Sequence, residues 1–235
     1  MSSPSRYFAT ALGALTLCCA IWSGEALAGP IAGQGTWENT LAPRVLKSGQ
    51  ANGPDAYFDS ALNITWLADT RLSAALTFGI SGIPADGRMN WATAQDWLSA
   101  LNGSHYLGHS DWRLPKTFDF GTPTYTPSPS SSEMAHLYYI ALGNPDYFNG
   151  PIQNTGPFAD LPGIYWSSAV DNPYISSAAY FNMNWGNQQT EQQSASLNVL
   201  VVRSGDTAPI PEPASYLLVL AGLFPLAVLA RRRCD

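Results

Sequence analysis

Residues 90–115 read NWATAQDWLSALNGSHYLGHSDWRLP, and their first half has the pattern of a capped amphipathic helix. Asn90 is a favourable N-cap, because its side-chain oxygen can accept a hydrogen bond from a free N–H group of the first turn. Asn102 and Gly103 are typical of a helix end. We therefore predict a helix over Trp91–Leu101. Its buried face is expected to contain Trp91, Ala94, Leu98 and Leu101.

The second half of this stretch ends in the motif DWRLP. In an extended segment Asp111 and Arg113 lie on one face and Trp112 on the other. We expect the two charged side chains to anchor neighbouring loops through charge-assisted hydrogen bonds, while Leu114 and Pro115 complete the motif. The alternative is a polar binding floor with Trp112 as its exposed platform.

A second helix is expected further along the chain. Ser132 is its N-cap, it covers Glu133–Leu142, and Gly143 and Asn144 end it. The residues expected to face inward are Met134, Leu137, Tyr138 and Ala141.

Short strands are expected before and after these helices. Residues 56–69, AYFDSALNITWLAD, predict two strands around a turn at 60–63. The other candidates are GIYWSS (163–168), SSAAYFNMN (176–184) and SLNVLVVRSG (196–205), and the Asn/Gln-rich residues 185–193 are predicted to be a connection. Two helices followed by a run of strands predict an α+β domain.

Three stretches are predicted to be irregular because they are rich in Gly, Pro or Ser. Residues 29–54 are expected to form a loose leader with one strand near Gly35–Asn39. Residues 71–89 and 121–132 are expected to be loops.

The N-terminus has the features of an export signal. Arg6 precedes the apolar stretch Tyr7–Ile21, and Ala26-Leu27-Ala28 has the small residues that signal peptidase accepts. We predict cleavage after Ala28, which makes residues 1–28 a signal peptide. The alternatives are a retained N-terminal anchor and a lipoprotein modified at Cys18, although no lipobox precedes that cysteine.

The C-terminus has a short apolar segment followed by positive charge. Ala214–Ala230 contains 17 uncharged residues, which as a helix would span about 25 Å, the short end of what crosses a bilayer. The three residues that follow are Arg231, Arg232 and Arg233. Positive residues flank the cytoplasmic end of a transmembrane helix, so the preceding domain is expected outside the inner membrane.

Pro211-Glu212-Pro213 stands directly before this apolar segment. With it, residues 207–235 resemble the PEP-CTERM sorting signal of Gram-negative bacteria that make exopolysaccharide. The resemblance implies that exosortase, an integral-membrane cysteine transpeptidase, removes the tail during export. The protein would then be anchored only transiently in the inner membrane, through a helix at 214–230, before it reaches the cell surface or extracellular matrix. A plain C-terminal membrane anchor is the alternative.

Removal of both end segments leaves residues 29–208 without cysteine, since the cysteines are Cys18, Cys19 and Cys234. The remaining segment therefore has no disulfide, thiolate metal ligand or thiol nucleophile. It contains 14 Asp and Glu against 7 Lys and Arg, a net charge of −7. This charge argues against nucleic acid as a partner, because such binding depends on basic contacts to phosphate.

Four motifs occur in order along the chain: a W-x-x-A helix that begins at Trp91, DWRLP, YWSS at 165–168 and a closing VRSG at 202–205. In these motifs and their order the chain resembles the Lcl C-terminal domain family, also called DUF1566. The resemblance covers residues 55–206. It implies the C-type-lectin-like architecture also seen in formylglycine-generating enzymes, with two helices and a small, mostly antiparallel sheet. It also implies a role at cell surfaces or in polysaccharide binding.

The sequence predicts no catalytic site, metal site or cofactor. His105 and His109 have the spacing of metal ligands on a helix, with Asp111 close behind, but the nearby glycines disfavour a helix. Glu133 and His136 give only one of the two Glu-x-x-His steps that a di-metal carboxylate site needs, and an exposed helix-start role is expected for Glu133.

Calcium is left open without support, because the calcium-lectin motifs are matched poorly by Asp171-Asn172-Pro173 and Trp185-Gly186-Asn187. No G-x-S-x-G motif or distinctive carboxylate pair indicates a hydrolase. The cysteines that bind copper in formylglycine-generating enzymes are absent from residues 29–208.

The best candidates for ligand binding lie between residues 165 and 193. Aromatic faces can stack on sugar rings, and amides can donate and accept hydrogen bonds with hydroxyl groups, so the combination suits a neutral polysaccharide. The alternative is that these aromatics are core residues and the amides form turns. The candidates are Tyr165, Trp166, Tyr174, Asn182, Asn184, Trp185 and Asn187, with Tyr180, Gln188 and Gln189 beside them.

We therefore expect an exported, noncatalytic protein of the envelope or exopolysaccharide matrix that binds glycan or another surface component. One alternative is a purely structural matrix protein without a specific ligand. The other is an enzyme that acts on envelope polysaccharide.

Overall fold

The computed structural model describes residues 28–47, 53–117, 124–161, 163–169 and 176–207 of the chain. The predicted sorting signal, Tyr174 and all of the predicted signal peptide except Ala28 lie outside these ranges. In the described part, none of the helices is long and apolar enough to cross a membrane.

The strands form two small antiparallel sheets. The first has the order β1-β2-β3-β7, with bounds Leu41–Arg44, Ala56–Asp59, Ile64–Leu67 and Val202–Ser204. The second has the order β4-β5-β6, with bounds Ile164–Trp166, Ser177–Asn182 and Asn187–Gln192. The sheets and the helices around them make an α+β architecture, as the sequence predicts.

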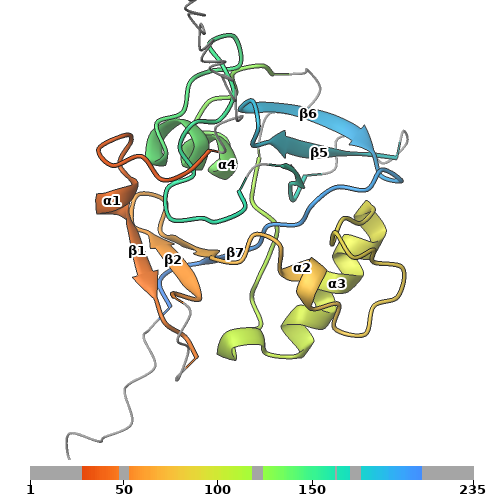
Figure 1. The fold of residues 1–235 in the computed structure, drawn as a ribbon. Coiled ribbons are helices and arrows are strands. Elements are labelled where there is room, and N and C mark those ends of the chain that lie inside the picture. Colours follow the sequence, from red (N-terminus) through yellow and green to blue (C-terminus); the bar gives the residue numbers. More distant parts are fainter. Residues whose placement is uncertain (1–27, 48–52, 118–123, 162, 170–175, 208–235) are drawn as a thin grey trace, which may run out of the picture.

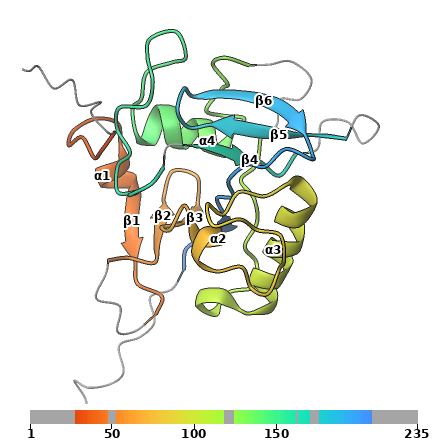
Figure 2. The ribbon, with the colours of Figure 1, turned by 45° about the vertical axis from the view of Figure 1, so that its right-hand side comes forward.

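The helices are short except for one. They are α1 (Trp37–Thr40), α2 (Leu72–Ala75), α3 (Trp91–Gly103), the 3-10 helix η1 (Tyr106–Gly108), α4 (Glu133–Ala135) and the π-helix η2 (His136–Ala141). Figures 1 and 2 show α3 on the side of the molecule opposite α1 and β1, and the β5–β6 hairpin beside α4.

Helix α3 begins where its cap residue predicts. The side chain of Asn90 accepts a hydrogen bond from Thr93 N at 2.9 Å. The helix continues to Gly103, two residues past the predicted end. Its buried face is centred on Trp97, which is fully buried, while the expected core residue Leu98 is only half-buried.

The second predicted helix is present but changes type along its length. Ser132 caps it, because its Oγ accepts a hydrogen bond from Ala135 N at 3.3 Å. The four residues predicted to face inward are all buried. After Ala135 the backbone widens into a π-helix, in which Leu142 N donates to the carbonyl of Leu137. Such a widening is rare and changes which side chains share a face.

Two secondary-structure predictions were wrong, one of a strand and one of a connection. Residues 35–39 are not a strand, because α1 begins at Trp37 and the first strand begins only at Leu41. Residues 185–193 are not merely a turn-rich connection: Asn187–Gln192 forms β6, which pairs with β5 along six residues. Backbone hydrogen bonds to β5 satisfy these polar residues, so low hydrophobicity does not prevent a strand here.

The stretch 196–205 connects the two halves of the domain, although only its end is a regular strand. Asn198 N donates to Ile164 O, while Leu67 N donates to Val201 O. Side chains of an extended segment alternate between its two faces. Accordingly Leu200 and Val202 are buried in one core cluster, and Val199 and Val201 in the other.

The N-terminal segment packs on the domain rather than forming the loose leader that we expected. Asn154 is fully buried, and its side-chain oxygen accepts hydrogen bonds from Ile31 N and Gly156 N, both at 2.9 Å. Its amide group donates to the carbonyls of Gln34 and Leu142. One side chain therefore attaches residues 31–34 to η2 and to its own loop.

Candidate functional site

The DWRLP motif links several elements of the core. Arg113 donates to both carboxylate oxygens of Glu133, at 2.8 Å each, and Glu133 also accepts a hydrogen bond from Lys116 N. Arg113 exchanges backbone hydrogen bonds with Val202. The expected exposed role of Glu133 was therefore wrong, since most of its side chain is buried in this ion pair.

The other charged residue of the motif anchors the last strand. Asp111 accepts hydrogen bonds from the guanidinium of Arg203 at 2.9 and 3.1 Å. These bonds hold the pKa of Asp111 below its usual value. Between the two charged residues, Trp112 is buried and donates its indole N–H to Tyr106 O. The anchoring expectation is confirmed, and the alternative of Trp112 as an exposed platform was wrong.

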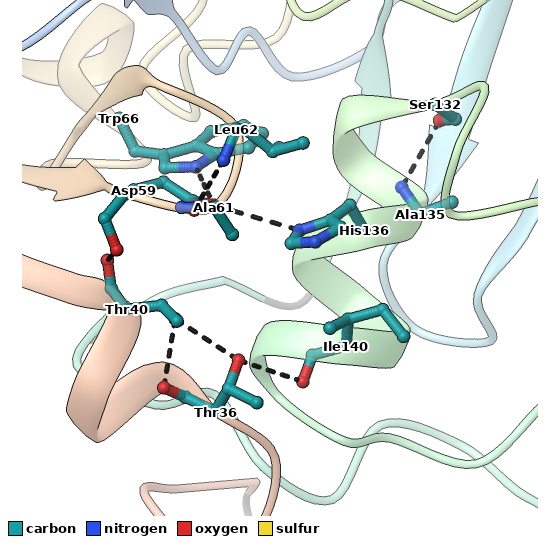
Figure 3. Close-up of polar contacts among 11 residues, drawn as sticks. Thr36, Thr40, Asp59, Ala61, Leu62, Trp66, Ser132, Ala135, His136 and Ile140 are labelled. Atoms are coloured by element: carbon teal, nitrogen blue, oxygen red, sulfur yellow. Dashed lines mark hydrogen bonds and ion pairs between the residues drawn. The ribbon is translucent and has the colours of Figure 1, made fainter.

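Figure 3 shows a second polar contact between distant elements, the pair Asp59 and His136. Asp59 is fully buried; Oδ1 accepts from the backbone N–H groups of Ala61 and Leu62, and Oδ2 from the indole N–H of Trp66. His136 Nδ1 lies 3.9 Å from Asp59 Oδ2, too far for a hydrogen bond. Three N–H groups already donate to the carboxylate of Asp59. We therefore assign Asp59 a structural role, which is to stabilise the β2–β3 turn.

The histidines do not come together as metal ligands. His105 has a positive φ of 50°, directly before η1, so no helix places it beside His109. His109 contacts the ring of Trp112, and Asp111 is bound to Arg203. Among the described residues, no group of three or more His, Cys, Asp or Glu is arranged to hold a metal ion.

The predicted glycan-binding residues fall into separate environments. Tyr165 and Trp166 are 1% and 0% exposed, so the expectation that they stack on sugar rings was wrong. As neighbours on β4, they point into the two different core clusters. Asn187 is also buried, while Asn182 and Asn184 are half-buried at the β5–β6 turn. Trp185 is 41% exposed and remains available as a platform.

Trp185 belongs to an exposed aromatic cluster that the sequence did not reveal. We define the aromatic cluster as Tyr125, Tyr147, Phe148 and Trp185. Tyr147 is central, with ring centroids 4.9 Å from Tyr125, 5.4 Å from Phe148 and 5.9 Å from Trp185. The exposed fractions of Phe148 and Tyr125 are 74% and 45%. Three large rings thus remain partly open to solvent at one place.

Hydrogen bonds fix the loop that carries Tyr147 and Phe148 and join it to the β5–β6 turn that carries Trp185. Asp146 Oδ1 accepts from Phe148 N at 3.0 Å and from Asn149 Nδ2 at 2.8 Å, which fixes the turn that carries Tyr147 and Phe148. Ile152 N donates to the carbonyl of Asn184 at 2.8 Å, which joins this loop to the β5–β6 turn.

The segment that carries Tyr125 is attached to β6, because Thr124 and Gln188 exchange backbone hydrogen bonds at 2.9 Å. The β5–β6 turn itself depends on Gly186, whose φ is 75° and whose carbonyl accepts from Tyr139 Oη at 2.7 Å. A Cβ at Gly186 would lie 2.5 Å from the ring of Tyr138. Trp185 is therefore presented by a turn that only glycine fits.

Few charges surround the aromatic cluster. In residues 124–131, 145–150 and 182–190, Asp146 is the only charged residue, and its Oδ1 is engaged within its own loop. Amide side chains are frequent instead, with Asn149, Asn182, Asn184 and Gln189 in the same segments. This chemistry favours a flat, uncharged ligand with hydroxyl groups over a charged one.

Sequence analysis missed three of the four cluster residues because they stand in irregular loops. Tyr125 lies in a Pro/Ser-rich stretch, and Tyr147 and Phe148 lie between Pro145 and Gly150. An aromatic residue inside a turn-rich loop has no core face to occupy, and this was the signal available. The sequence could not show that the loops meet, because they join the β5–β6 turn only in the folded chain.

These observations define an α+β domain with a motif-based polar framework and an exposed aromatic surface. The sequence model of the Lcl C-terminal domain family matches residues 56–203, and the chain belongs to this family. No curated protein matches the chain. The folded unit extends beyond the matched residues, since β1 pairs with β2 and residues 31–34 bond to Asn154.

Proposed function

We propose that this protein is an exported, noncatalytic component of the cell envelope or exopolysaccharide matrix that binds a neutral glycan through the aromatic cluster. The observation that carries the proposal is the exposure of Tyr125, Phe148 and Trp185 around Tyr147 in surroundings with one charge. Exposed apolar patches on soluble domains commonly mark interaction sites. The lectin-like architecture implied by the family resemblance is consistent with this role and stays a prediction.

The proposed ligand is a polysaccharide because the aromatic cluster is a surface of several rings rather than an enclosed pocket. A chain of sugar rings can contact successive aromatic faces, while the surrounding amides bond to its hydroxyl groups.

Export and sorting are part of the same proposal. Signal peptidase cleavage after Ala28 would leave Gly29 at the N-terminus, where its carbonyl accepts a hydrogen bond from Thr155 N. Exosortase would then remove the tail that begins near Pro211-Glu212-Pro213. Replacement of these three residues by alanine should leave uncleaved protein in the inner membrane, detected by immunoblots of membrane and extracellular fractions. Normal processing of that variant would refute the sorting step.

The binding step is tested by calorimetric titration of the exported protein with purified exopolysaccharide from the producing bacterium, with and without calcium. Phe148→Ala and Trp185→Ala should each weaken binding about tenfold, the usual size of a contact that dominates an interface. The matched control is Leu76→Ala, because Leu76 is 42% exposed and lies outside the aromatic cluster. Calcium is expected to have no effect on binding by the aromatic cluster.

Each other outcome has a distinct meaning. Saturable binding that is equal in all three variants would refute the aromatic cluster as the site. Self-association without saturable binding would support the purely structural alternative. Shortening of the polysaccharide during the titration would show that the protein is an enzyme.

A further inference from the structure

The four rings of the aromatic cluster do not form a flat surface. The ring plane of Tyr147 makes angles of 49° with that of Tyr125, 85° with that of Phe148 and 53° with that of Trp185. Tyr125 and Phe148, which also contact each other, are tilted by 50°. All four of these contacts therefore join rings that are strongly inclined to each other.

Phe148 faces a different direction from both other exposed rings. Its plane is tilted by 50° from that of Tyr125. Its tilt from Trp185 is at least 32°, because these two rings make angles of 85° and 53° with Tyr147 and the smallest possible tilt is the difference between those angles. Since Phe148 is 74% exposed, the most accessible ring of the aromatic cluster is also the one that breaks its flatness.

Local contacts fix the tilt of Phe148. Asp146 Oδ1 accepts a hydrogen bond from Phe148 N at 3.0 Å, which holds the backbone that carries the ring. The ring itself lies against two others, with centroids 5.8 Å from Tyr125 and 5.4 Å from Tyr147. These spacings are within the range of favourable aromatic contacts. The tilt is thus a property of the packed loops and not of a free side chain.

This tilt decides which shape of glycan chain can use the exposed rings. Aromatic faces stack on the apolar faces of sugar rings, so the sugars must follow the planes of the rings that they contact. In a flat, ribbon-like chain the sugar faces are parallel, and such a chain stacked on Phe148 would meet Tyr125 and Trp185 at an angle. A chain that bends between successive sugars can place one sugar on Phe148 and the next on a neighbouring ring.

We propose that the aromatic cluster selects neutral glycans whose chain bends from one sugar to the next, and that Phe148 determines this selectivity. Rings in contact have centroids 4.9–5.9 Å apart, about the size of one sugar unit, so adjacent sugars of a bent chain contact adjacent rings. A flat glycan loses either Phe148 or the two other exposed rings. This inference rests on the proposed glycan binding and adds the shape of the glycan to it.

The test is a calorimetric titration of the exported protein with laminarihexaose and cellohexaose. Both are neutral chains of six β-linked glucose units, and they differ only in the hydroxyl group that links one glucose to the next, which makes the first chain bent and the second straight and flat. Laminarihexaose should bind at least about tenfold more tightly, because it stacks on one more ring. Equal affinities, tighter binding of cellohexaose, or no heat with either compound would overturn the proposal.

Variants assign the preference to one ring. Phe148→Ala should lose about tenfold in affinity for laminarihexaose and little for cellohexaose, so that the preference disappears. The matched control is Phe148→Tyr, which keeps the ring and should keep the preference. A preference that survives in Phe148→Ala would overturn the role of Phe148. Thermal unfolding checks that both variants are folded.

The exopolysaccharide titration separates this inference from the proposed function. If exopolysaccharide binds and both Phe148→Ala and Trp185→Ala weaken that binding, while the two hexasaccharides bind equally, the glycan site stands and selection by chain shape fails. If neither exopolysaccharide nor a hexasaccharide binds, both fail.

Discussion

Replacement of Glu133 by glutamine should destabilise the protein because it removes the charge that neutralises Arg113 inside the fold. The two side chains are only 14% and 23% exposed. Removal of one partner from a buried ion pair costs about 3–5 kcal/mol, and exposed pairs contribute about 0–1 kcal/mol. The partial exposure places the expected loss between these limits, at about 2–3 kcal/mol.

The comparison that isolates this effect is Asp206→Asn. Asp206 makes the same two-bond contact with Arg44, at 2.7 and 2.8 Å, but its side chain is 44% exposed. We expect this variant to lose less than about 1 kcal/mol.

Urea unfolding at pH 7 measures both losses, and an unchanged dependence on urea concentration shows that the unfolding reaction is the same. For a chain of this size the melting temperature should fall by about 5–10 °C for Glu133→Gln and by about 3 °C or less for Asp206→Asn. Equal losses would refute the argument that burial makes the Arg113–Glu133 pair the stronger one. Below its melting temperature Glu133→Gln should bind glycan normally; a loss of binding would instead indicate that the DWRLP motif is part of a binding floor.

Three further predictions concern single positions. Gly186→Ala should lower the free energy of unfolding by several kcal/mol, because alanine is strained at this positive φ and its Cβ would contact the Tyr138 ring. Gly82 has a φ of 80° but open space around it, so Gly82→Ala should lower that free energy by only about 1 kcal/mol in urea unfolding. Similar losses in the two variants would contradict the steric argument. Asn154→Ala should leave several buried groups without hydrogen-bond partners and lower the free energy of unfolding by about 3 kcal/mol or more. It should also accelerate hydrogen exchange at the Ile31 amide. Unchanged exchange there would show that other contacts hold residues 31–34 on the domain. Because Arg203 lowers the pKa of Asp111 in the folded state, this pair should stabilise the protein above the unfolded carboxyl pKa of about 3.9 and lose its effect as the pH falls through the lower folded value. Asp111→Asn should therefore be less stable than the parent at pH 7 and equally stable near pH 2, and a difference that persists in acid would contradict this origin.

The elements that sequence analysis predicted well depend on local chemistry. Asn90 and Ser132 cap their helices as expected, since a cap and the N–H group that it accepts from are three residues apart in both cases. The strands on either side of residues 60–63 have the predicted bounds within a few residues, because a short turn fixes their pairing. The family motifs were recognisable for the same reason: each is a short, contiguous pattern.

The candidate site was less predictable because exposure is a property of the whole fold. Tyr165, Trp166 and Trp185 are similar in sequence terms, yet the first two lie in separate core clusters and only the third is exposed. Strand β6 also escaped prediction, since the hydrogen bonds that stabilise its polar residues come from β5 and not from its own composition.

The sequence by itself determined the two capped helices, the α+β class and the family of this protein, because caps, periodicity and motifs act over a few neighbouring residues. The tertiary structure alone decided which aromatic rings meet at the surface. Tyr125, Tyr147 and Trp185 come from three separate segments of the chain. Such contacts arise when strand pairing and core packing bring segments together that are far apart in the sequence. A local sequence pattern does not predict which of these segments meet.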